Sequence, residues 1–224
     1  MIEAHGVGHA YGARRVLHGV DLRLSEQRIG VVGANGSGKS TFARMLNGLV
    51  LPSEGRVLVD GLDTRSDGRA VRRRVGFCFT DPDAQIVMPT VAEDVAFGLR
   101  RRGLSRDEVR SRVDGALASY ALAGHRDHPA HLLSGGQKQL LALASVLVTE
   151  PDVLVMDEPT TLLDLRNATM ISRVVADLPQ QVALVTHHLD LLAGFDRVLV
   201  FDEGGVVCDD EPAAAVAHYR RLMA

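Results

Sequence analysis

The sequence lacks several features by which whole classes of protein are recognised. Only two of its 224 residues are cysteine, Cys78 and Cys208, which form no disulfide framework and no metal-binding spacing, as expected for a reducing compartment. Basic residues are not in excess, because the net charge is -3, so no overall positive field recruits nucleic acid.

Long apolar runs are also absent. The longest, residues 140–148, contains Ser145 and is too short to span a bilayer. The first residues lack the charged start and apolar stretch of a signal peptide. If the protein works at a membrane, we expect another chain to supply the membrane part.

What is present is a chain able to bury a real core, since 46% of its residues are hydrophobic. Four short, β-branched, almost entirely apolar runs predict buried parallel strands, at residues 29–32, 153–156, 182–185 and 198–201. Each ends at a polar residue or glycine, and the first three are expected to lead into helices. This alternation predicts an α/β sheet with functional groups at the carboxyl ends of strands.

Two other regions have a different pattern. The first sixty residues contain alternating segments, among them 57–59, that predict a small antiparallel sheet. Residues 90–144 are rich in Ala, Leu, Arg, Asp and Glu at helical spacing, which predicts a helical insertion within the α/β core.

The strongest motif follows the first predicted strand and precedes a predicted helix over residues 41–49. It matches G-x-x-x-x-G-K-[ST] with one further threonine, and its residues are Gly33, Ala34, Asn35, Gly36, Ser37, Gly38, Lys39, Ser40 and Thr41. The glycines let backbone N–H groups face phosphate oxygens, and the helix N-terminus adds partial positive charge. Lys39 is predicted to reach the β- and γ-phosphates, and the Ser40 hydroxyl to ligate Mg²⁺.

A second motif places two carboxylates, Asp157 and Glu158, at the end of the predicted strand 153–156. In isolation this pattern is more often an acidic turn. Beside a phosphate-binding loop, Asp157 can hold Mg²⁺ through its water shell and Glu158 can polarise an attacking water. The pairing of the two motifs therefore favours a catalytic site.

The third motif is Leu133, Ser134, Gly135, Gly136 and Gln137, ahead of a helix predicted over residues 138–148. By local chemistry this is a helix N-terminus with a serine cap, and it is equally consistent with a plain capped helix and with an anion site.

Together, in this order and at these separations, the three motifs resemble the ATP-binding subunit of an ABC transporter. The resemblance covers nearly the whole chain, and the Leu-Ser-Gly-Gly-Gln segment is highly specific for it. It implies ATP and Mg²⁺ as ligands, Lys39 and Ser40 in the phosphate loop, Asp157 as the magnesium-associated aspartate in the second shell, and Glu158 as the catalytic glutamate. It further implies His187, rather than His188, as the histidine that senses the γ-phosphate, and Tyr11 as the aromatic that stacks on adenine.

The resemblance also implies the architecture. It is an α/β fold, with a P-loop NTPase core of mainly parallel strands, an N-terminal antiparallel β subdomain and an inserted helical subdomain. Residues 1–224 would form one ABC ATPase domain, with a core of about 1–85 and 145–224 and a helical subdomain of about 86–144. Two copies, identical or paralogous, are expected to face head to tail, so that residues 133–137 of one close on the phosphate bound to the other.

A narrower resemblance rests on Asp81-Pro82-Asp83-Ala84-Gln85 and on residues 93–98, Glu-Asp-Val-Ala-Phe-Gly. Both are similar to ATPases of energy-coupling factor (ECF) importers, which take up vitamins and transition-metal ions. Among these the biotin importers are the nearest, ahead of cobalt and nickel importers. The resemblance implies a transmembrane coupling protein and a small membrane protein that captures substrate, no nucleic acid, and a peripheral place on the cytoplasmic face of the cell membrane.

Two positions depart from the family pattern. Thr80 stands where a glutamine normally contacts Mg²⁺ and the attacking water, so we expect Thr80 to reach the metal only through water. Gln85 matches a second, importer-specific glutamine of the coupling loop and need not compensate. Around Asp164, Leu162 and Leu165 replace a small residue and a proline, which changes the expected dimer contacts of that loop.

Other interpretations stay open at this point. A soluble ABC protein handling nucleic acid usually has two ATPase units or a long coiled coil, which this chain lacks. A low-turnover regulatory nucleotide-binding module remains compatible with Thr80, although Lys39, Glu158 and His187 argue against it. An arginine-rich stretch, made up of Arg100, Arg101, Arg102, Arg106, Arg110 and Arg112, is interpreted first as a solvated face and second as a contact with an acidic partner or membrane surface.

Overall fold

The apolar runs of the sequence fold as two sheets, and the alanine- and leucine-rich middle folds as helices. The computed structural model describes residues 1–100 and 102–224, so Arg101 of the arginine-rich stretch lies outside the described residues. Contacts divide the chain into two units. The first comprises residues 1–77, 152–158 and 176–224, and the second comprises residues 78–151 and 159–175.

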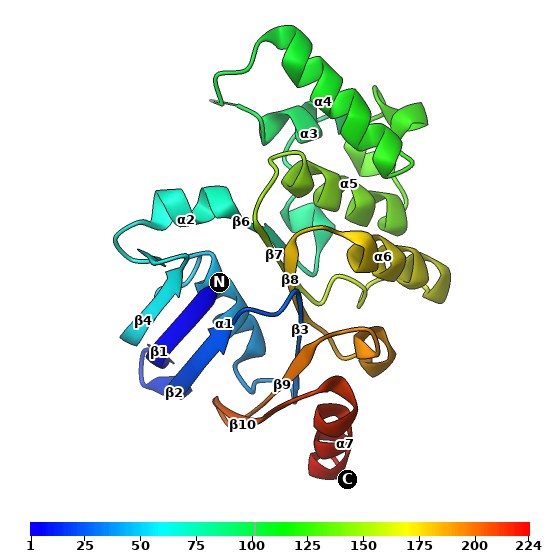
Figure 1. Ribbon diagram of the computed structural model, residues 1–224. Helices are drawn as coiled ribbons and strands as arrows, with labels where there is room; N and C mark the ends of the chain where they lie inside the picture. Colours follow the sequence, from blue (N-terminus) through cyan, green and yellow to red (C-terminus); the bar gives the residue numbers. More distant parts are fainter. Residues whose placement is uncertain (101) are drawn as a thin grey trace. The chain divides into compact units, whose positions relative to one another are not determined.

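The first sheet of the first unit is antiparallel, as the alternation in the first sixty residues predicts. Its strands lie in the order β2-β1-β4-β5, and β2, β1 and β4 are labelled side by side in Figure 1. Their bounds are β1 (Ile2–Tyr11), β2 (Arg14–Leu24), β4 (Glu54–Val59) and β5 (Leu62–Asp63).

The second sheet contains all four predicted parallel strands, which are confirmed with slightly wider bounds. They are β3 (Arg28–Gly33), β7 (Val153–Asp157), β8 (Gln181–Val185) and β9 (Arg197–Asp202). The sheet order is β10-β9-β3-β8-β7-β6, where β6 is Val75–Cys78 and the antiparallel edge strand β10 is Gly205–Asp210. Every residue of β3 and β7 is buried, which explains their continuous apolar sequence.

Helix α1 (Lys39–Leu46) packs on strands of both sheets of this unit. The Phe42 ring lies 5.2 Å from that of Phe201, between centroids. The predicted bounds of 41–49 are wrong at both ends: Gly38, in a left-handed conformation, is the N-cap, and Gly48 at φ +71° follows the C-cap. Helices α2 (Gly68–Arg74) and α7 (Pro212–Leu222) complete the unit, and α7 lies against β9 and β10 (Figure 1).

The prediction of an α-helix after the strand at 182–185 is also wrong. Only a short 3-10 helix, η4 (Leu189–Leu192), follows β8. Gly194 comes two residues later, and Asp196 accepts a hydrogen bond from the backbone of Arg28 at 2.7 Å, so the chain turns directly into β9.

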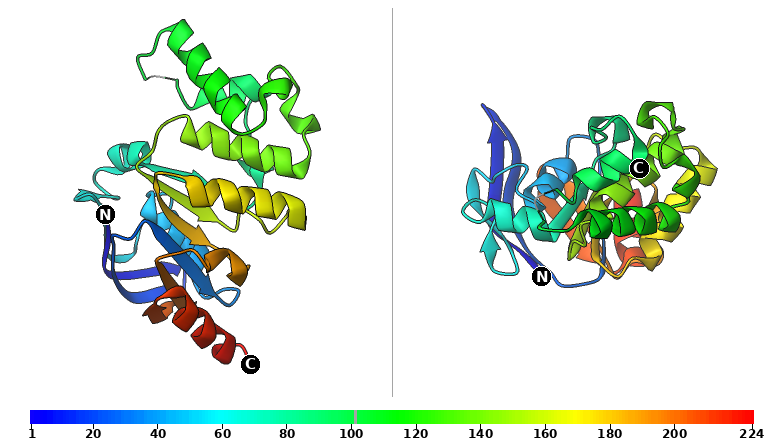
Figure 2. Two further views of the ribbon diagram at one scale, coloured as in Figure 1. Left: turned by 45° about the vertical axis from the view of Figure 1, so that its right-hand side comes forward. Right: turned by 90° about the horizontal axis from the view of Figure 1, so that it is seen from above.

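The second unit is helical, as predicted for residues 90–144. It contains α3 (Val91–Phe97), α4 (Arg106–Ser119) and α5 (Gly135–Leu147), grouped as in Figure 2, and the beginning of α6 (Leu165–Asp177). Three short 3-10 helices connect them: η1 (Pro82–Ala84), η2 (Ala123–His125) and η3 (Ala130–Leu132). Within the described part of 90–144 the only β pairing is an isolated bridge between Thr90 and Pro129.

Capping boxes define where these helices start. The pairs Thr90 with Glu93, Ser105 with Glu108, and Ser134 with Gln137 each exchange side-chain and backbone hydrogen bonds. For α5 this places the first turn at Gly135, three residues before the predicted start, because the Ser134 cap holds two glycines in helical geometry. The division into a core and a helical subdomain at residues 86 and 144 stays a prediction.

Candidate functional site

The loop between β3 and α1 has the backbone geometry that its glycines predict. A Cβ on Gly33, whose φ is +150°, would stand 2.1 Å from the Phe201 carbonyl oxygen. A Cβ on Gly38, at φ +102°, would stand 2.5 Å from the Leu17 side chain. Only glycine therefore fits at either position, and the loop curls tightly over the end of the sheet.

Lys39 is held inside this loop. Its side-chain nitrogen donates to the Gly33 and Ala34 carbonyl oxygens at 2.7 Å each, and only 4% of the residue is exposed. Burial lowers the pKa of the Lys39 ammonium, while the charges of Glu158 and Asp157 raise it. An ammonium has three protons, so one remains for a phosphate oxygen after the two carbonyls are satisfied.

Ser40 and Asp157 lie together although they are far apart in the sequence. The Ser40 hydroxyl donates to Asp157 Oδ1 at 2.8 Å, and Arg44, one turn further along α1, lies 3.3 Å from Oδ2. Burial raises the pKa of the Asp157 carboxyl, and Ser40 and Arg44 oppose that rise. A hydroxyl beside a buried carboxylate is the donor set of an Mg²⁺ that keeps waters and substrate phosphates as its other ligands, so these residues fit the expected ion.

Glu158 and His187 face one another at the ends of two neighbouring strands. His187 Nε2 lies 2.8 Å from Glu158 Oε1, and the Glu158 side chain is 16% exposed. Glu158 adopts φ +52°, a left-handed conformation that is uncommon for a residue with a side chain. Its N–H nevertheless remains tied to the Val185 carbonyl oxygen at 2.9 Å.

His188, the alternative to His187, has a different environment. It is exposed, and its backbone N–H donates to the Thr186 hydroxyl at 3.0 Å. His187 is thus the histidine beside the carboxylate, and its role as the γ-phosphate sensor stays a prediction.

One cavity of the first unit collects most of these residues. It has a volume of about 320 Å³ and is lined by Tyr11, Arg14, Val16, Asn35, Gly36, Gly38, Lys39, Ser40, Thr41 and Glu158. Tyr11 is 52% exposed at the end of β1. The centroid of its ring lies 4.6 Å from that of the His9 ring, in an edge-to-face arrangement. An exposed aromatic, a phosphate loop and a carboxylate thus border a single cavity.

Sequence reasoning missed two cations of the first unit, Arg14 and Arg44. Arg14 lines the cavity, and Arg44 lies 3.3 Å from the buried Asp157 carboxylate that Ser40 also contacts. For Arg44 a signal existed, because it lies four residues after Ser40 and shares a helix face with it. For Arg14 the signal depends on strand pairing.

The Leu-Ser-Gly-Gly-Gln segment lies in the second unit and begins α5. Leu133 is buried, whereas Ser134 and Gly135 are exposed at the helix N-terminus. The Gln137 side chain accepts from the Ser134 N–H at 2.9 Å and contacts His125 at 2.9 Å. The Gln137 amide therefore stabilises the first turn of α5, and Ser134 and Gly135 are the residues of this turn that are exposed.

The corner after β6 also lies in the second unit. Gln85 accepts from the Phe79 N–H at 3.1 Å and donates to the Ala142 carbonyl oxygen at 3.3 Å. The adjacent Thr80 is half-buried. Both ends of the Gln85 amide are thus hydrogen-bonded to backbone groups around this corner. The relation of Thr80 to the metal site stays a prediction.

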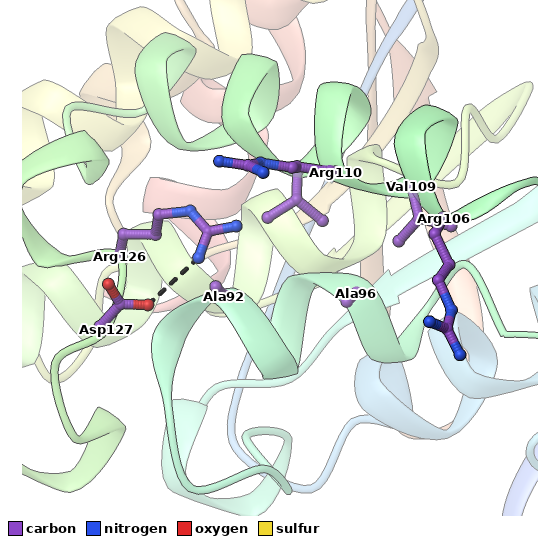
Figure 3. A pocket seen from close by; sticks show the side chains of 8 residues that line it. Ala92, Ala96, Arg106, Val109, Arg110, Arg126 and Asp127 are labelled. Atoms are coloured by element: carbon purple, nitrogen blue, oxygen red, sulfur yellow. Dashed lines mark hydrogen bonds and ion pairs between the residues drawn. The ribbon is translucent and has the colours of Figure 1, made fainter.

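A second cavity, of about 540 Å³, lies between α3 and α4 (Figure 3). Ala92, Ala96, Val109 and Val113 form its apolar part, with Arg106, Arg110, Arg126 and Asp127 around it.

Carboxylates pair with several arginines of this region. Arg126 lies 2.9 Å from Asp114 and 3.1 Å from Asp127, and Arg112 lies 3.2 Å from Glu150. These pairs are exposed, and Arg112 is the member of the arginine-rich stretch among them. The choice between a solvated face and a contact with an acidic partner or membrane surface stays a prediction.

The loop around Asp164 exposes the two leucines that depart from the family pattern. Leu162 is 63% exposed and Leu165 is 85% exposed. Among the described residues, no helix is both long enough and apolar enough to cross a membrane.

The family model described as "ABC transporter" matches residues 17–161. A putative ABC transporter ATP-binding protein of Deinococcus radiodurans is 56% identical, covering 100% of this chain and 99% of that protein. The biotin transport ATP-binding protein BioM of Rhizobium etli is 48% identical over the same shares. The solved structure of CbiO1 from Clostridium perfringens, titled as part of the ABC transporter complex cbiONQ, superposes with a TM-score of 0.86 at 33% identity, covering 99% and 92% of the two chains.

Proposed function

The chain belongs to the family of ABC transporter ATP-binding proteins and is an ATPase, and from this premise we propose that it powers an ECF-type importer. The proposed cargo is biotin, with cobalt and nickel ions as the next candidates. The resemblance to BioM along the whole chain supports biotin, and the likeness to CbiO1 supports the importer group. The observation that carries the ATPase assignment is the 2.8 Å contact between Glu158 and His187 beside the phosphate-loop cavity.

The binding step follows from the cavity. ATP would place its adenine against Tyr11 and its phosphates on the loop amides, with the third proton of Lys39 directed to a phosphate oxygen. Ser40 would hold Mg²⁺ directly and Asp157 would hold it through water, and the chemistry that a bound ion would supply is neutralisation of charge on the transferred phosphoryl group.

The hydrolytic step needs a group that accepts a proton from water. Glu158 has that role in the proposal, because its carboxylate borders the cavity and is held in place by the imidazole of His187 at 2.8 Å. His187 would orient the carboxylate and contact the γ-phosphate, so that the pair responds to the presence of ATP rather than ADP.

Closure of the site is proposed to need a second copy or a paralogue, since ABC ATP-binding proteins function as dimers. Ser134 and Gly135 are the exposed groups of the signature segment available to a phosphate on the facing subunit. A separate transmembrane coupling protein and a small membrane capture protein are the proposed partners, which would place the chain at the cytoplasmic face of the membrane. No nucleic-acid partner is proposed.

The test combines co-purification with uptake. The tagged chain is purified from detergent-solubilised membranes of its own cells, co-purifying membrane proteins are identified, and uptake of labelled biotin, cobalt and nickel is measured with wild type and Glu158→Gln. We expect a small membrane protein to co-purify and biotin uptake to be lost in the variant. Membranes free of the chain, or uptake of all three cargoes unaffected by Glu158→Gln, would refute the proposal.

A further inference from the structure

Arg14 is a cation of the nucleotide cavity that the motifs do not include. It is the first residue of β2, it is exposed, and it lines the cavity with the phosphate loop. Within residues 1–100 and 102–224, its guanidinium makes no hydrogen bond or ion pair. The next residue, Arg15, contrasts with it, because its guanidinium lies 3.1 Å from Glu54.

Strand pairing explains why the two neighbouring arginines differ. Tyr11 at the end of β1 pairs with Arg14 at the start of β2, across the turn formed by Gly12 and Ala13. Residues paired across an antiparallel ladder project from the same face, whereas successive residues project from opposite faces. Arg14 therefore shares the face of Tyr11 and reaches the cavity, while Arg15 points to the other face.

The reach of Arg14 extends to the phosphate loop itself. Its Nη2 lies 3.7 Å from the position that a Cβ on Gly36 would occupy. Gly36 is in the middle of the loop whose amides would face phosphate in the proposed function, and the loop's own cation, Lys39, is buried and bonded to two carbonyls. A guanidinium at this place offers an exposed fork of donors that matches phosphate geometry.

We propose that Arg14 is a nucleotide-binding residue that donates to the phosphates nearest the ribose, between the Tyr11 end of the cavity and the Glu158–His187 pair. This inference rests on the cavity being the ATP site of the proposed function. Such a contact is made equally with ATP, ADP and the transition state. It therefore raises affinity for nucleotide without a matching effect on kcat.

The experiment compares Arg14→Gln with Arg15→Gln in the full-length protein. Both remove one positive charge from the same turn, but only Arg14 faces the cavity. The dissociation constants of ATP, ADP and inorganic tripolyphosphate are measured with Mg²⁺, together with KM and kcat for ATP. Tyr11→Ala serves as a second reference, because it should weaken ATP and ADP but leave tripolyphosphate unchanged.

We expect Arg14→Gln to weaken all three ligands by about tenfold and to raise KM by a similar factor, with kcat within twofold of wild type. Arg15→Gln should match wild type, and Arg14→Lys should recover part of the loss. Equal affinities in the two glutamine variants would overturn the proposal. So would a loss confined to ATP and ADP, which would indicate a displaced Tyr11 instead of a lost phosphate contact.

The result also separates this proposal from the ATPase assignment. If wild type binds ATP and Lys39→Ala does not, while Arg14→Gln is unaffected, only the role of Arg14 fails. If wild type binds none of the three ligands, both the nucleotide site and the role of Arg14 are refuted.

Discussion

The imidazole Nε2 of His187 lies 2.8 Å from Oε1 of Glu158, and the two residues follow adjacent parallel strands. Asp157 is in register with Val185, so the chain leaves both strands at the same edge of the sheet. The left-handed φ of Glu158 then carries its side chain out of the strand direction to the cavity. Backbone register therefore places a carboxylate and an imidazole together at the phosphate loop.

Glu158→Gln should lower kcat for ATP by at least about 100-fold, because the amide cannot accept a proton from water. ATP affinity should change little, since the amide keeps the size of the carboxylate, and bound ATP should stabilise the dimer. Steady-state ATPase assays and size-exclusion chromatography with ATP measure the two effects. An undiminished kcat would exclude Glu158 as the base.

His187→Ala should reduce kcat strongly, whereas His188→Ala should leave it within about twofold of wild type. The histidines are neighbours of the same chemistry, but His187 lies 2.8 Å from Glu158, whereas the His188 side chain is exposed. ATPase assays on both variants make the comparison. A larger loss in His188→Ala would reverse the assignment of the γ-phosphate sensor.

A substitution at Gly136 can show whether the signature segment, residues 133–137, contacts a ligand or only packs against Asn167. A Cβ at Gly136 would stand 2.3 Å from Asn167 Oδ1 and 2.4 Å from its Cγ. Gly136→Ala should therefore destabilise the protein by roughly 1–3 kcal/mol, and Asn167→Ala in the same chain should relieve the clash. Urea unfolding measures both.

The double variant then separates two explanations. If the glycine is needed for close approach of nucleotide on a second copy, Gly136→Ala with Asn167→Ala regains stability but stays inactive, while Asn167→Ala alone is active. Recovered ATPase activity in the double variant would show that the glycine serves only the contact with Asn167.

The buried thiol of Cys78 should make the free energy of unfolding depend on pH in the alkaline range. Burial raises the pKa of its thiol from 9.0 to about 12, and a hydrogen bond with Gln85 opposes the rise. Between these values the unfolded chain has lost the proton that the folded chain keeps, so the stabilisation is complete below pH 9 and falls as pH rises.

We expect wild type to lose about 1 kcal/mol more stability than Cys78→Ala between pH 8 and pH 10, measured by urea unfolding. Cys208→Ala is the comparison at a half-buried thiol, whose pKa is also raised by burial and by the charges of Asp210 and Asp209, so its pH curve should depart from wild type in the same direction but by less. Parallel pH curves for wild type and Cys78→Ala would contradict the prediction.

The parts of the site that could be predicted depend on contiguous residues. Gly33 and Gly38 determine a loop conformation through local backbone geometry, and the apolar runs determine β3 and β7 through their burial. The carboxyl ends of buried parallel strands meet at one sheet edge, which is why the position of Asp157 beside Ser40 could be predicted from sequence.

The parts that could not be predicted depend on the register of paired strands or on backbone carbonyl groups that lie far apart in the sequence from the side chain they contact. The position of Arg14 at the cavity follows from its pairing with Tyr11 across a turn, which no motif encodes. Arg28 is a further case: it is 8% exposed, and its guanidinium donates to the carbonyl oxygens of Gln27, Gln180, Ala176 and Leu178. A buried arginine satisfied by backbone groups leaves no pattern of charged partners in the sequence.

Thr80 provides the last prediction, because the local structure excludes the simplest compensation for its short side chain. Gln85 is bonded to the Phe79 N–H and the Ala142 carbonyl oxygen, so its amide holds the corner beside Thr80 and cannot also replace the missing glutamine. Thr80→Gln should then raise ATP turnover in the assembled transporter by about tenfold, the gain of one hydrogen bond at the metal or attacking water. Thr80→Val is the control for side-chain size, and it should not raise turnover. ATPase and uptake rates of Thr80→Gln equal to those of wild type would mean that threonine already suffices for coupling, and that the short side chain does not limit hydrolysis.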